Sequence, residues 1–184
     1  VQVYLFLTLY KYVVEWKKRL VLENELEIAK KIQQSFLPKK LPGLSGIDIA
    51  ASMFTARQVG GDLYDFVEFG PDRLGVMIGD VSGKGVPASL FMAMVTGEFK
   101  FFASPQTPPQ NVLSDLNLRL VKESSSNLFV TIFYLIFDIV HGTVTYSNGG
   151  HLPVIYLSAD KGEVSFLDVS EGAPLGLMEG PYSG

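Results

Sequence analysis

The sequence contains no cysteine, one tryptophan and two histidines among its 184 residues. The lack of cysteine excludes a disulfide framework and any zinc site built on thiolates, and it fits a reducing cytosol, so we expect a cytoplasmic protein. Lysine and arginine number 15 against 19 aspartates and glutamates. This mildly acidic balance argues against a nucleic-acid binder and is compatible with a phosphorylated protein as partner.

Long apolar runs are also absent. Residues 1–10 are apolar but are followed by Lys11, whereas a spanning helix needs roughly 20 apolar residues. Two interpretations stay open: a helix that buries one face against a partner or another domain, and the remnant of a membrane span or sensor domain. The chain begins at Val1, shows no cleavable signal and stops in a loop-like stretch, so we expect a fragment of a longer protein.

The apolar residues that are present, 47% of the chain, are enough for one domain with a substantial core. Residues 3–37 predict one long helix, which Pro38 ends. One face of this helix carries apolar residues at three- and four-residue steps, namely Leu22, Leu26, Ala29, Ile32 and Phe36. This stripe predicts a helix packed on the domain, and its length also allows a coiled-coil dimer contact.

From Ile47 the pattern changes to short strands and two further helices. We expect strands at 47–55, 63–69, 73–78, 128–140, 143–148, 152–157 and 164–167, and helices at 86–102 and 110–123, the latter with Val112, Leu113, Leu116 and Leu120 inward. Strands joined by short turns form antiparallel sheets, and the two helices follow one another. The order predicts an α+β fold.

Two acidic turns stand out. Asp62 follows Gly60-Gly61 at the start of one expected hairpin strand, and Asp80 lies at the end of its partner. If the hairpin closes at residues 70–72, both carboxylates fall at its open end, where they repel unless a cation lies between them. Mg²⁺ and Mn²⁺ prefer such oxygen ligands, and glycine lets a backbone carbonyl join them. The alternative is that both are ordinary turn residues, since Gly and Asp favour turns everywhere.

Other patterns carry less. Residues 83–88 fit G-x-G-x-x-A before a helix, the form of a dinucleotide fingerprint, but the neighbouring strand belongs to a hairpin and not to a βαβ unit. A P-loop aligned on Gly83-Lys84 lacks its first glycine and its Ser or Thr. His141 lies in a turn and fits a solvated residue. His151 follows Asn148-Gly149-Gly150, where a catalytic, supporting or purely structural role stays open.

The ordered motifs resemble the SpoIIE/RsbU branch of the PPM-type metal-dependent serine/threonine phosphatases. They cover about residues 23–180 and read VGGDLYD at 59–65, GDVSGKGVPA at 79–88, SNGGHLP at 147–153 and PLG at 174–176, after a lead-in AKKIQQSFLP at 29–38. The resemblance implies an αββα sandwich of two antiparallel sheets flanked by helices, C-terminally incomplete. It further implies a linker or regulatory helix at 1–40 and a phosphatase domain at 41–184.

The same resemblance implies a pair of Mn²⁺ or Mg²⁺ ions and gives the acidic turns roles. Asp80 would bridge the metals, Val81 would offer its backbone carbonyl, and Asp62 would bind directly or through water, which makes Asp62 and Asp80 the expected catalytic residues. Asp65 and His151 would be supporting residues. Related phosphatases carry a later Thr-Asp-Gly strand end and a further acidic motif, neither of which occurs before Gly184. We therefore expect half of the ligands here.

Two functions from different classes follow from the resemblance. The first is hydrolysis of phosphoserine or phosphothreonine on a partner protein, typically a STAS-domain anti-anti-sigma regulator in bacterial partner-switching and stress-response signalling, with a homodimer through the N-terminal helix. The second is a catalytically incomplete, phosphatase-like regulatory binding module. A nucleotide-binding domain rests on the glycine pattern alone. An acidic strand end in the parent protein after Gly184 would favour the enzyme.

Overall fold

The computed structural model describes residues 2–55, 58–123, 127–167, 172–178, 180 and 182. The long helix α1 (Gln2–Phe36) comes first. It is followed in chain order by β1 (Asp62–Glu68), β2 (Arg73–Val81), α2 (Val86–Phe102), α3 (Pro109–Glu123), β3 (Val130–Asp138), β4 (Thr143–Gly149), β5 (Ile155–Leu157) and β6 (Val164–Phe166).

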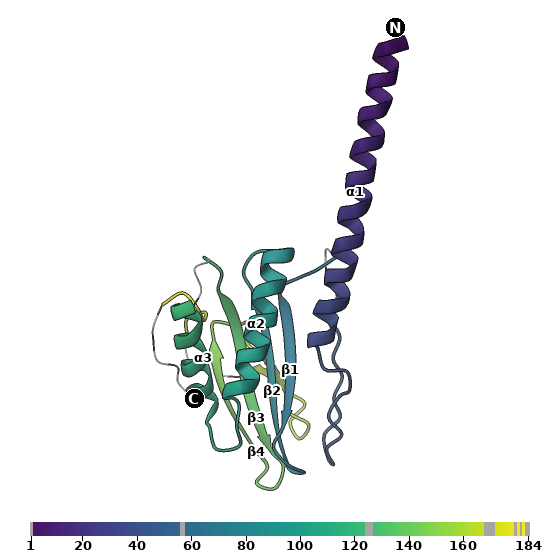
Figure 1. Ribbon diagram of the computed structural model, residues 1–184. Helices are drawn as coiled ribbons and strands as arrows, with labels where there is room; N and C mark the ends of the chain where they lie inside the picture. The colour runs from purple at the N-terminus through teal and green to yellow at the C-terminus, as the bar shows by residue number, and fades with distance from the viewer. Residues whose placement is uncertain are drawn as a thin grey trace.

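The strands form two antiparallel sheets. The larger has the order β1-β2-β3-β4, and the smaller pairs β5 with β6. Helices α2 and α3 lie together over one face of the larger sheet (Figure 1). These features confirm the predicted α+β class with antiparallel sheets and grouped helices. Since β2 runs antiparallel to both of its neighbours, no βαβ unit surrounds the glycine pattern at 83–88.

The core lies between the larger sheet and the two helices. Each helix turns one apolar face toward the sheet, because buried residues recur at three- and four-residue steps. On α2 they are Ala88, Phe91, Met92, Val95 and Phe99, and on α3 they are the predicted Val112, Leu113, Leu116 and Leu120. Phe99 meets Tyr134 of β3 edge to face, with ring centroids 4.9 Å apart.

The other face of the larger sheet is only partly covered. Residues 47–52 and Val154 border an apolar cleft of about 520 Å³ over it, whose floor includes Tyr64, Phe66, Ile78 and Leu135. The expected strand at 47–55 is wrong, because this segment pairs with no strand among the described residues. Residues 47–52 lie over the face of the sheet instead, so the alternation of apolar and polar residues reflects packing on that face and not pairing with a strand.

Helix α1 projects away from the domain and contacts it only near its C-terminal end (Figure 1). The half-buried or buried residues there are Leu26, Ala29, Lys30 and Gln33. The predicted apolar stripe was therefore partly wrong: Leu22 and Ile32 are each 55% exposed and Phe36 is 40% exposed. Leu22 shares the helix face of Leu26 and Gln33 but lies where α1 has already left the domain (Figure 1), whereas Ile32 lies beside that face, which includes a polar residue.

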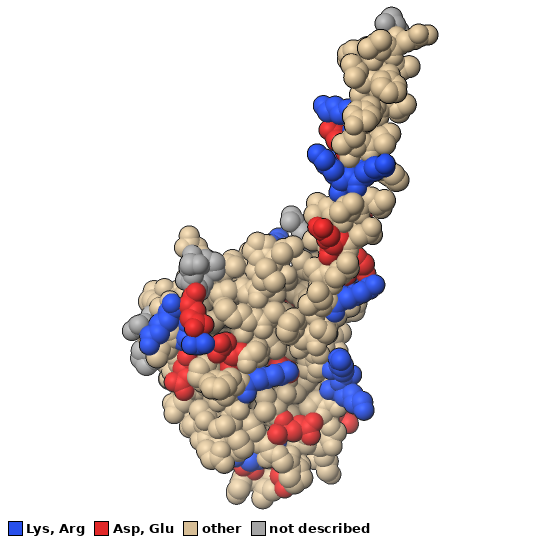
Figure 2. All heavy atoms as spheres, viewed as in Figure 1, with Lys and Arg blue, Asp and Glu red and all other residues tan. Residues whose placement is uncertain are grey.

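The outer part of α1 is apolar and exposed. Val3, Tyr4, Leu5 and Phe6 are each at least 67% exposed, and Figure 2 shows this end as an uncharged surface above a belt of charged side chains. In the described part of the chain, no helix combines the length and the apolar content needed to cross a membrane.

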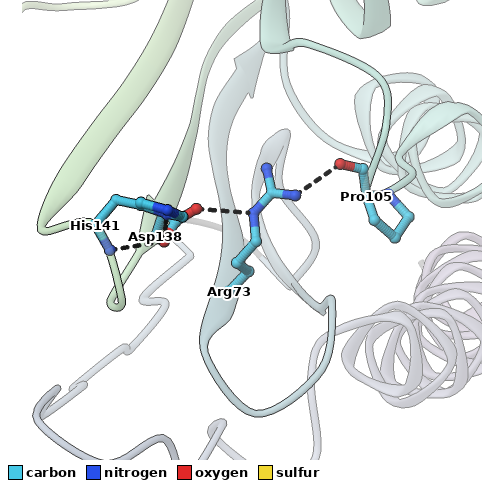
Figure 3. A network of polar contacts seen from close by, with 4 residues as sticks. All are labelled: Arg73, Pro105, Asp138 and His141. Carbon is cyan, nitrogen blue, oxygen red and sulfur yellow. Dashed lines mark hydrogen bonds and ion pairs between the residues drawn. The ribbon is translucent and has the colours of Figure 1, made fainter.

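A polar network closes the end of the sheet at the β1–β2 and β3–β4 turns (Figure 3). Asp138 accepts hydrogen bonds from the backbone N–H of His141 at 3.1 Å and interacts with its ring Nδ1 at 2.9 Å. Arg73 Nε lies 3.5 Å from Asp138 Oδ2, and Arg73 Nη1 donates to the carbonyl of Pro105 at 2.9 Å. The loop between α2 and α3 is thereby tied to this end of the sheet.

Candidate metal centre

The two predicted carboxylates meet at the opposite end of the same sheet. Asp62 begins β1 and stands directly across from Asp80 of β2 in the antiparallel register, so their side chains lie on the same face of the sheet. Their neighbours Leu63 and Val81 are each 1% exposed and point into the core, because successive side chains of a strand alternate between faces. The buried apolar neighbours thus place the acids outside the core.

Gly61 lets the two strands approach closely beside the acids. A Cβ atom at Gly61 would lie 2.7 Å from the backbone carbonyl oxygen of Val81, a contact that side chains do not tolerate. The Val81 N–H also donates to the Gly61 carbonyl at 3.3 Å. The Val81 carbonyl, the predicted backbone ligand, therefore lies against the residue that precedes Asp62.

The acid pair brings two carboxylates together. Partial burial raises the pKa of Asp80 above its usual range, and the charge of Asp62 and a hydrogen bond with it raise the pKa further. Within the described residues, neither carboxylate forms an ion pair. A carboxylate pair of this kind favours either a shared proton or a bound cation.

A small cavity of about 190 Å³ opens in front of the acids. Its lining combines the two carboxylates with glycine backbone and one cation: Thr55, Val59, Gly60, Gly61, Asp62, Asp80, Gly83 and Lys84. Mg²⁺ is bound in proteins through one or two carboxylates, several waters and substrate phosphate. The donor chemistry of Asp62, Asp80 and the Val81 carbonyl fits part of such a shell. In the part of the chain that the structure describes, no three His, Cys, Asp or Glu side chains gather to complete it.

His151 lies at the same end of the sheet. Its Nδ1 is 2.9 Å from Thr131 Oγ1, and Thr131 stands opposite Asp80 in the β2–β3 register. Asn148 holds the His151 backbone at both groups, accepting from its N–H at 2.7 Å and donating to its carbonyl at 2.9 Å. Burial lowers the pKa of His151, an effect that the charge of Asp62 opposes.

Two other predicted or considered residues lie elsewhere. Asp65 is 1% exposed and faces the helix layer, where Lys100 Nζ of α2 approaches its carboxylate at 2.9 Å. Burial raises the pKa of Asp65 and Lys100 opposes that shift. Its predicted support of the acid pair is therefore not direct. His141 belongs to the polar network at the far end of the sheet.

Thr131 and Lys84 were not expected as site residues from the sequence. Thr131 is 51 residues from Asp80 along the chain, so only the pairing of β2 with β3 brings them together. Lys84 belongs to the GKG motif, and Asn148 belongs to the SNGGHLP motif, three residues before His151. The sequence motifs thus contain Lys84 and Asn148, but spacing alone did not indicate which residues they contact.

The fold is that of PP2C-type phosphatase domains. The SiaA-PP2C domain of Pseudomonas aeruginosa shares the fold, with TM-score 0.69, 19% identity and coverage of 90% of this chain and 66% of that one. The RsbU and RsbW domains of a Mycobacterium tuberculosis protein match with TM-score 0.60 and 26% identity, over 70% of this chain and 36% of that one.

Sequence comparison narrows the class to a family. The family described as Stage II sporulation protein E (SpoIIE) matches residues 70–183, and the chain belongs to it. "Phosphoserine phosphatase RsbU" of Bacillus subtilis (strain 168) is 33% identical over 161 residues, which are 86% of this chain and 47% of the relative. The chain thus spans about half the length of that relative. The suspected family is confirmed.

Proposed function

We propose that this chain carries out metal-dependent hydrolysis of phosphoserine or phosphothreonine on a partner protein. The observation that carries the proposal is the direct pairing of Asp62 with Asp80 at the open end of the β1–β2 hairpin. The related RsbU, named a phosphoserine phosphatase, supports the same reaction class. We infer residues 1–40 as a linker or regulatory helix and 41–184 as the phosphatase domain.

Asp62, Asp80 and the Val81 carbonyl would hold Mn²⁺ or Mg²⁺, with Asp80 between two ions when the site is complete. A two-metal site supplies an acidified water as nucleophile and a clamp for the phosphate oxygens. Other residues position these groups. Gly61 allows the close approach of Val81, and hydrogen bonds from Thr131 and Asn148 position His151 near Asp62 and Asp80. His151 is a supporting residue in this proposal.

Lys84 contributes the one cationic side chain among the residues that line the small cavity. A lysine ammonium binds phosphate as a point charge. We propose that Lys84 attracts the phosphate group of the substrate to the cavity, while the carboxylates would repel it unless cations are bound to them. Charge complementarity at the cavity therefore depends on bound cations.

The proposed partner is a phosphorylated STAS-domain regulator of the anti-anti-sigma type in bacterial, cytoplasmic signalling. A homodimer through α1 is part of the proposal, since Leu5, Leu9, Tyr12 and Trp16 are each at least 61% exposed and recur at helical spacing. Deleting residues 1–22 is expected to change the oligomeric state and the turnover. Unchanged values for both would remove the dimer from the proposal.

The test is Mn²⁺-dependent phosphate release from a phosphoserine-bearing STAS-domain protein by the full-length protein. Asp80→Asn should lower turnover by at least about a hundredfold, because even residues behind metal ligands affect affinity or activity by about 10- to 100-fold. Asp72→Asn, the same change in the turn at the far end of the hairpin, is the matched control and should retain activity. Wild-type turnover in Asp80→Asn would refute the role of Asp80.

A phosphatase-like binding module without catalysis is the second candidate. It is favoured by the finding that no third acidic or histidine ligand joins the acid pair within the described ranges. Under this alternative, the full-length protein binds the phosphorylated partner without releasing phosphate at any Mn²⁺ concentration. Binding measured by calorimetry, together with phosphate release, separates the two functions.

A further inference from the structure

Three exposed apolar side chains border the small cavity in front of the acid pair. Phe54 is 88% exposed, Leu152 is 79% exposed and Val86 is 40% exposed. Phe54 directly precedes Thr55, and Val86 follows Lys84 by two residues, and both Thr55 and Lys84 line the cavity. A single exposed apolar side chain is ordinary on a protein surface, whereas several beside one concave site are typical of an interaction surface.

The backbone that carries Phe54 and Val86 is fixed by contacts at the cavity. Thr55 packs so closely on Gly60 that an added Cβ atom there would lie 3.1 Å from Thr55 Cγ2. Val86 is the first residue of α2, and the proline that follows it in the first turn restricts the backbone of the residue before it. Both apolar side chains therefore project from backbone that is anchored beside the acid pair.

Leu152 reaches the same end of the sheet through His151. The His151 ring contacts Thr131 of β3 at 2.9 Å, and Asn148 hydrogen-bonds both the N–H and the carbonyl of His151. The other two apolar side chains lie before β1 and after β2. Because β1, β2 and β3 are neighbours in the sheet and adjacent strands are about 4.8 Å apart, the three side chains are distributed over three adjacent strand ends.

The cavity itself is too small to recognise a partner protein. Its volume is about 190 Å³, below the roughly 300–1,000 Å³ of pockets that enclose a small-molecule ligand. It has room for a phosphoseryl group, which Lys84 and bound cations attract in the proposed function, but not for the chain around that group. Preference for one phosphoprotein over another therefore has to come from the surface outside the cavity.

We propose that Phe54, Val86 and Leu152 form a docking surface for a folded phosphoprotein that presents its phosphoserine between apolar side chains of its own. This inference rests on the proposed function, because the phosphoserine is taken to enter the cavity of the acid pair. Apolar contacts around a polar centre exclude water from it, as around the hot spots of protein interfaces.

The spread of these side chains over three strand ends favours a folded partner over a flexible peptide. A folded domain holds its matching side chains in place before it binds. A flexible phosphopeptide has to be ordered along the same path, and ordering of loops and side chains at an interface costs affinity. Charge at the cavity is therefore shared by both kinds of ligand, and the apolar surface distinguishes them.

The first experiment compares two substrates of the full-length protein with Mn²⁺: the phosphoserine-bearing STAS-domain protein and p-nitrophenyl phosphate, a small phosphomonoester that needs only the cavity. Phe54→Ala combined with Leu152→Ala should lower kcat/KM for the phosphoprotein by about 30-fold, the effect of losing one interface hot spot. The loss should appear in KM, because docking contacts are made before the reaction and remain during it. Turnover of p-nitrophenyl phosphate should stay at the wild-type level.

The matched control is Phe101→Ala, which removes the same side chain from another exposed position. Phe101 is 80% exposed and lies fifteen residues beyond Val86 on α2, about 22 Å along the helix at 1.5 Å per residue. It should hydrolyse both substrates like the wild type. Val86→Ala removes a less exposed side chain and should raise KM for the phosphoprotein by less than the double variant does.

The second experiment measures binding by calorimetry and needs no turnover. The ligands are the phosphoprotein and a phosphopeptide with the same residues around the phosphoserine, each added with Mn²⁺ to the wild type and to Asp80→Asn protein. The phosphoprotein should bind more tightly than the phosphopeptide. Phe54→Ala with Leu152→Ala should remove most of that difference and should leave the affinity for the phosphopeptide nearly unchanged.

The outcomes separate this inference from the proposed function. Wild-type KM for the phosphoprotein in the double variant, or an equal loss with both substrates, overturns the docking role. Equal affinity for phosphoprotein and phosphopeptide overturns the folded partner. A changed oligomeric state of the double variant in analytical ultracentrifugation would assign the surface to a second copy of this chain and overturn the proposal as well. A wild type that binds the phosphoprotein through these residues but releases no phosphate overturns the proposed function and supports the docking surface.

Discussion

The pKa of an aspartate is shifted in opposite directions at the two ends of the four-stranded sheet. At one end Asp80 faces Asp62, and burial together with the second carboxylate raises the pKa of Asp80. At the other end Asp138 receives hydrogen bonds from the backbone and the ring of His141, the two largest causes of its lowered pKa, and Arg73 adds its charge. Strand β2 contributes to both ends, with Asp80 at one and Arg73 at the other.

The difference separates a structural end of the sheet from the end that we propose binds metal. Asp138 is satisfied by protein groups, and its network ties two turns and the α2–α3 loop together (Figure 3). Asp62 and Asp80, by contrast, carry like charges and are paired directly across β1 and β2. Carboxylates with perturbed pKa values in a cavity are typical of functional sites. The predictions below test this contrast, from the largest effect to the smallest.

Mn²⁺ should stabilise the protein through the acid end alone. At a free concentration of one hundred times Kd, a ligand that binds only the folded state adds about 2.7 kcal/mol, which raises Tm by roughly 5–10 °C in a domain of this size. Scanning fluorimetry with and without Mn²⁺ checks the shift. It should vanish in Asp80→Asn and persist in Asp138→Asn, and an equal loss in both variants would break the contrast between the ends.

Gly61→Ala should damage the acid end by forcing apart Gly61 and the Val81 carbonyl. The new methyl group would lie 2.7 Å from a backbone oxygen, and overpacking of this kind costs about 1–3 kcal/mol. Chemical denaturation measures the loss, and Mn²⁺ affinity should fall with it. The control is Gly97→Ala in α2, where a Cβ meets nothing within 4 Å and replacing helical glycine stabilises by about 0.5–1 kcal/mol. A neutral Gly61→Ala would contradict the close approach.

Without metal, the same Asp→Asn change should have opposite signs at the two ends. Because the folded-state pKa of Asp80 lies above its ordinary value of 3.8, ionisation of Asp80 destabilises the metal-free folded protein at neutral pH. Asp80→Asn removes this penalty and should raise Tm. The gain in the free energy of unfolding should be no more than about 1 kcal/mol, because the Asp80 side chain is largely exposed. Asp138→Asn should lower Tm. Thermal scans in a chelator at pH 7 compare them, and a common sign would refute the contrast.

The contribution of Asp138 should be lost in acid. Its pKa is lowered from 3.8, so its ionised form stabilises the fold above pH 3.8, and the stabilisation fades as the pH falls through the lower folded-state pKa. Urea unfolding of wild type and Asp138→Asn at several pH values should give curves that differ at neutral pH and converge well below pH 3.8. A difference that persists unchanged in acid would show that charge is not the cause.

Much of the fold could be predicted from local patterns. The bounds of α1, α2, α3 and the β1–β2 hairpin follow from periodicity and from proline and glycine signals, and the structure confirms them to within a few residues. The segment 47–55 could not be assigned in this way, because alternation marks an extended chain over a sheet face as readily as a strand. Only the presence of a pairing partner separates the two.

The sequence by itself determined that two Gly-Asp turns flank one hairpin, and a hairpin closed at residues 70–72 places Asp62 across from Asp80 by local geometry alone. Tertiary structure decided the rest. Pairing of β2 with β3 brought Thr131 and His151 to the acids, packing of α2 turned Asp65 toward Lys100, and docking of α1 placed Gln33 on Gly60. These contacts join residues 20 to 51 positions apart or on separate elements, where the chain's local periodicity holds no information about which faces will meet.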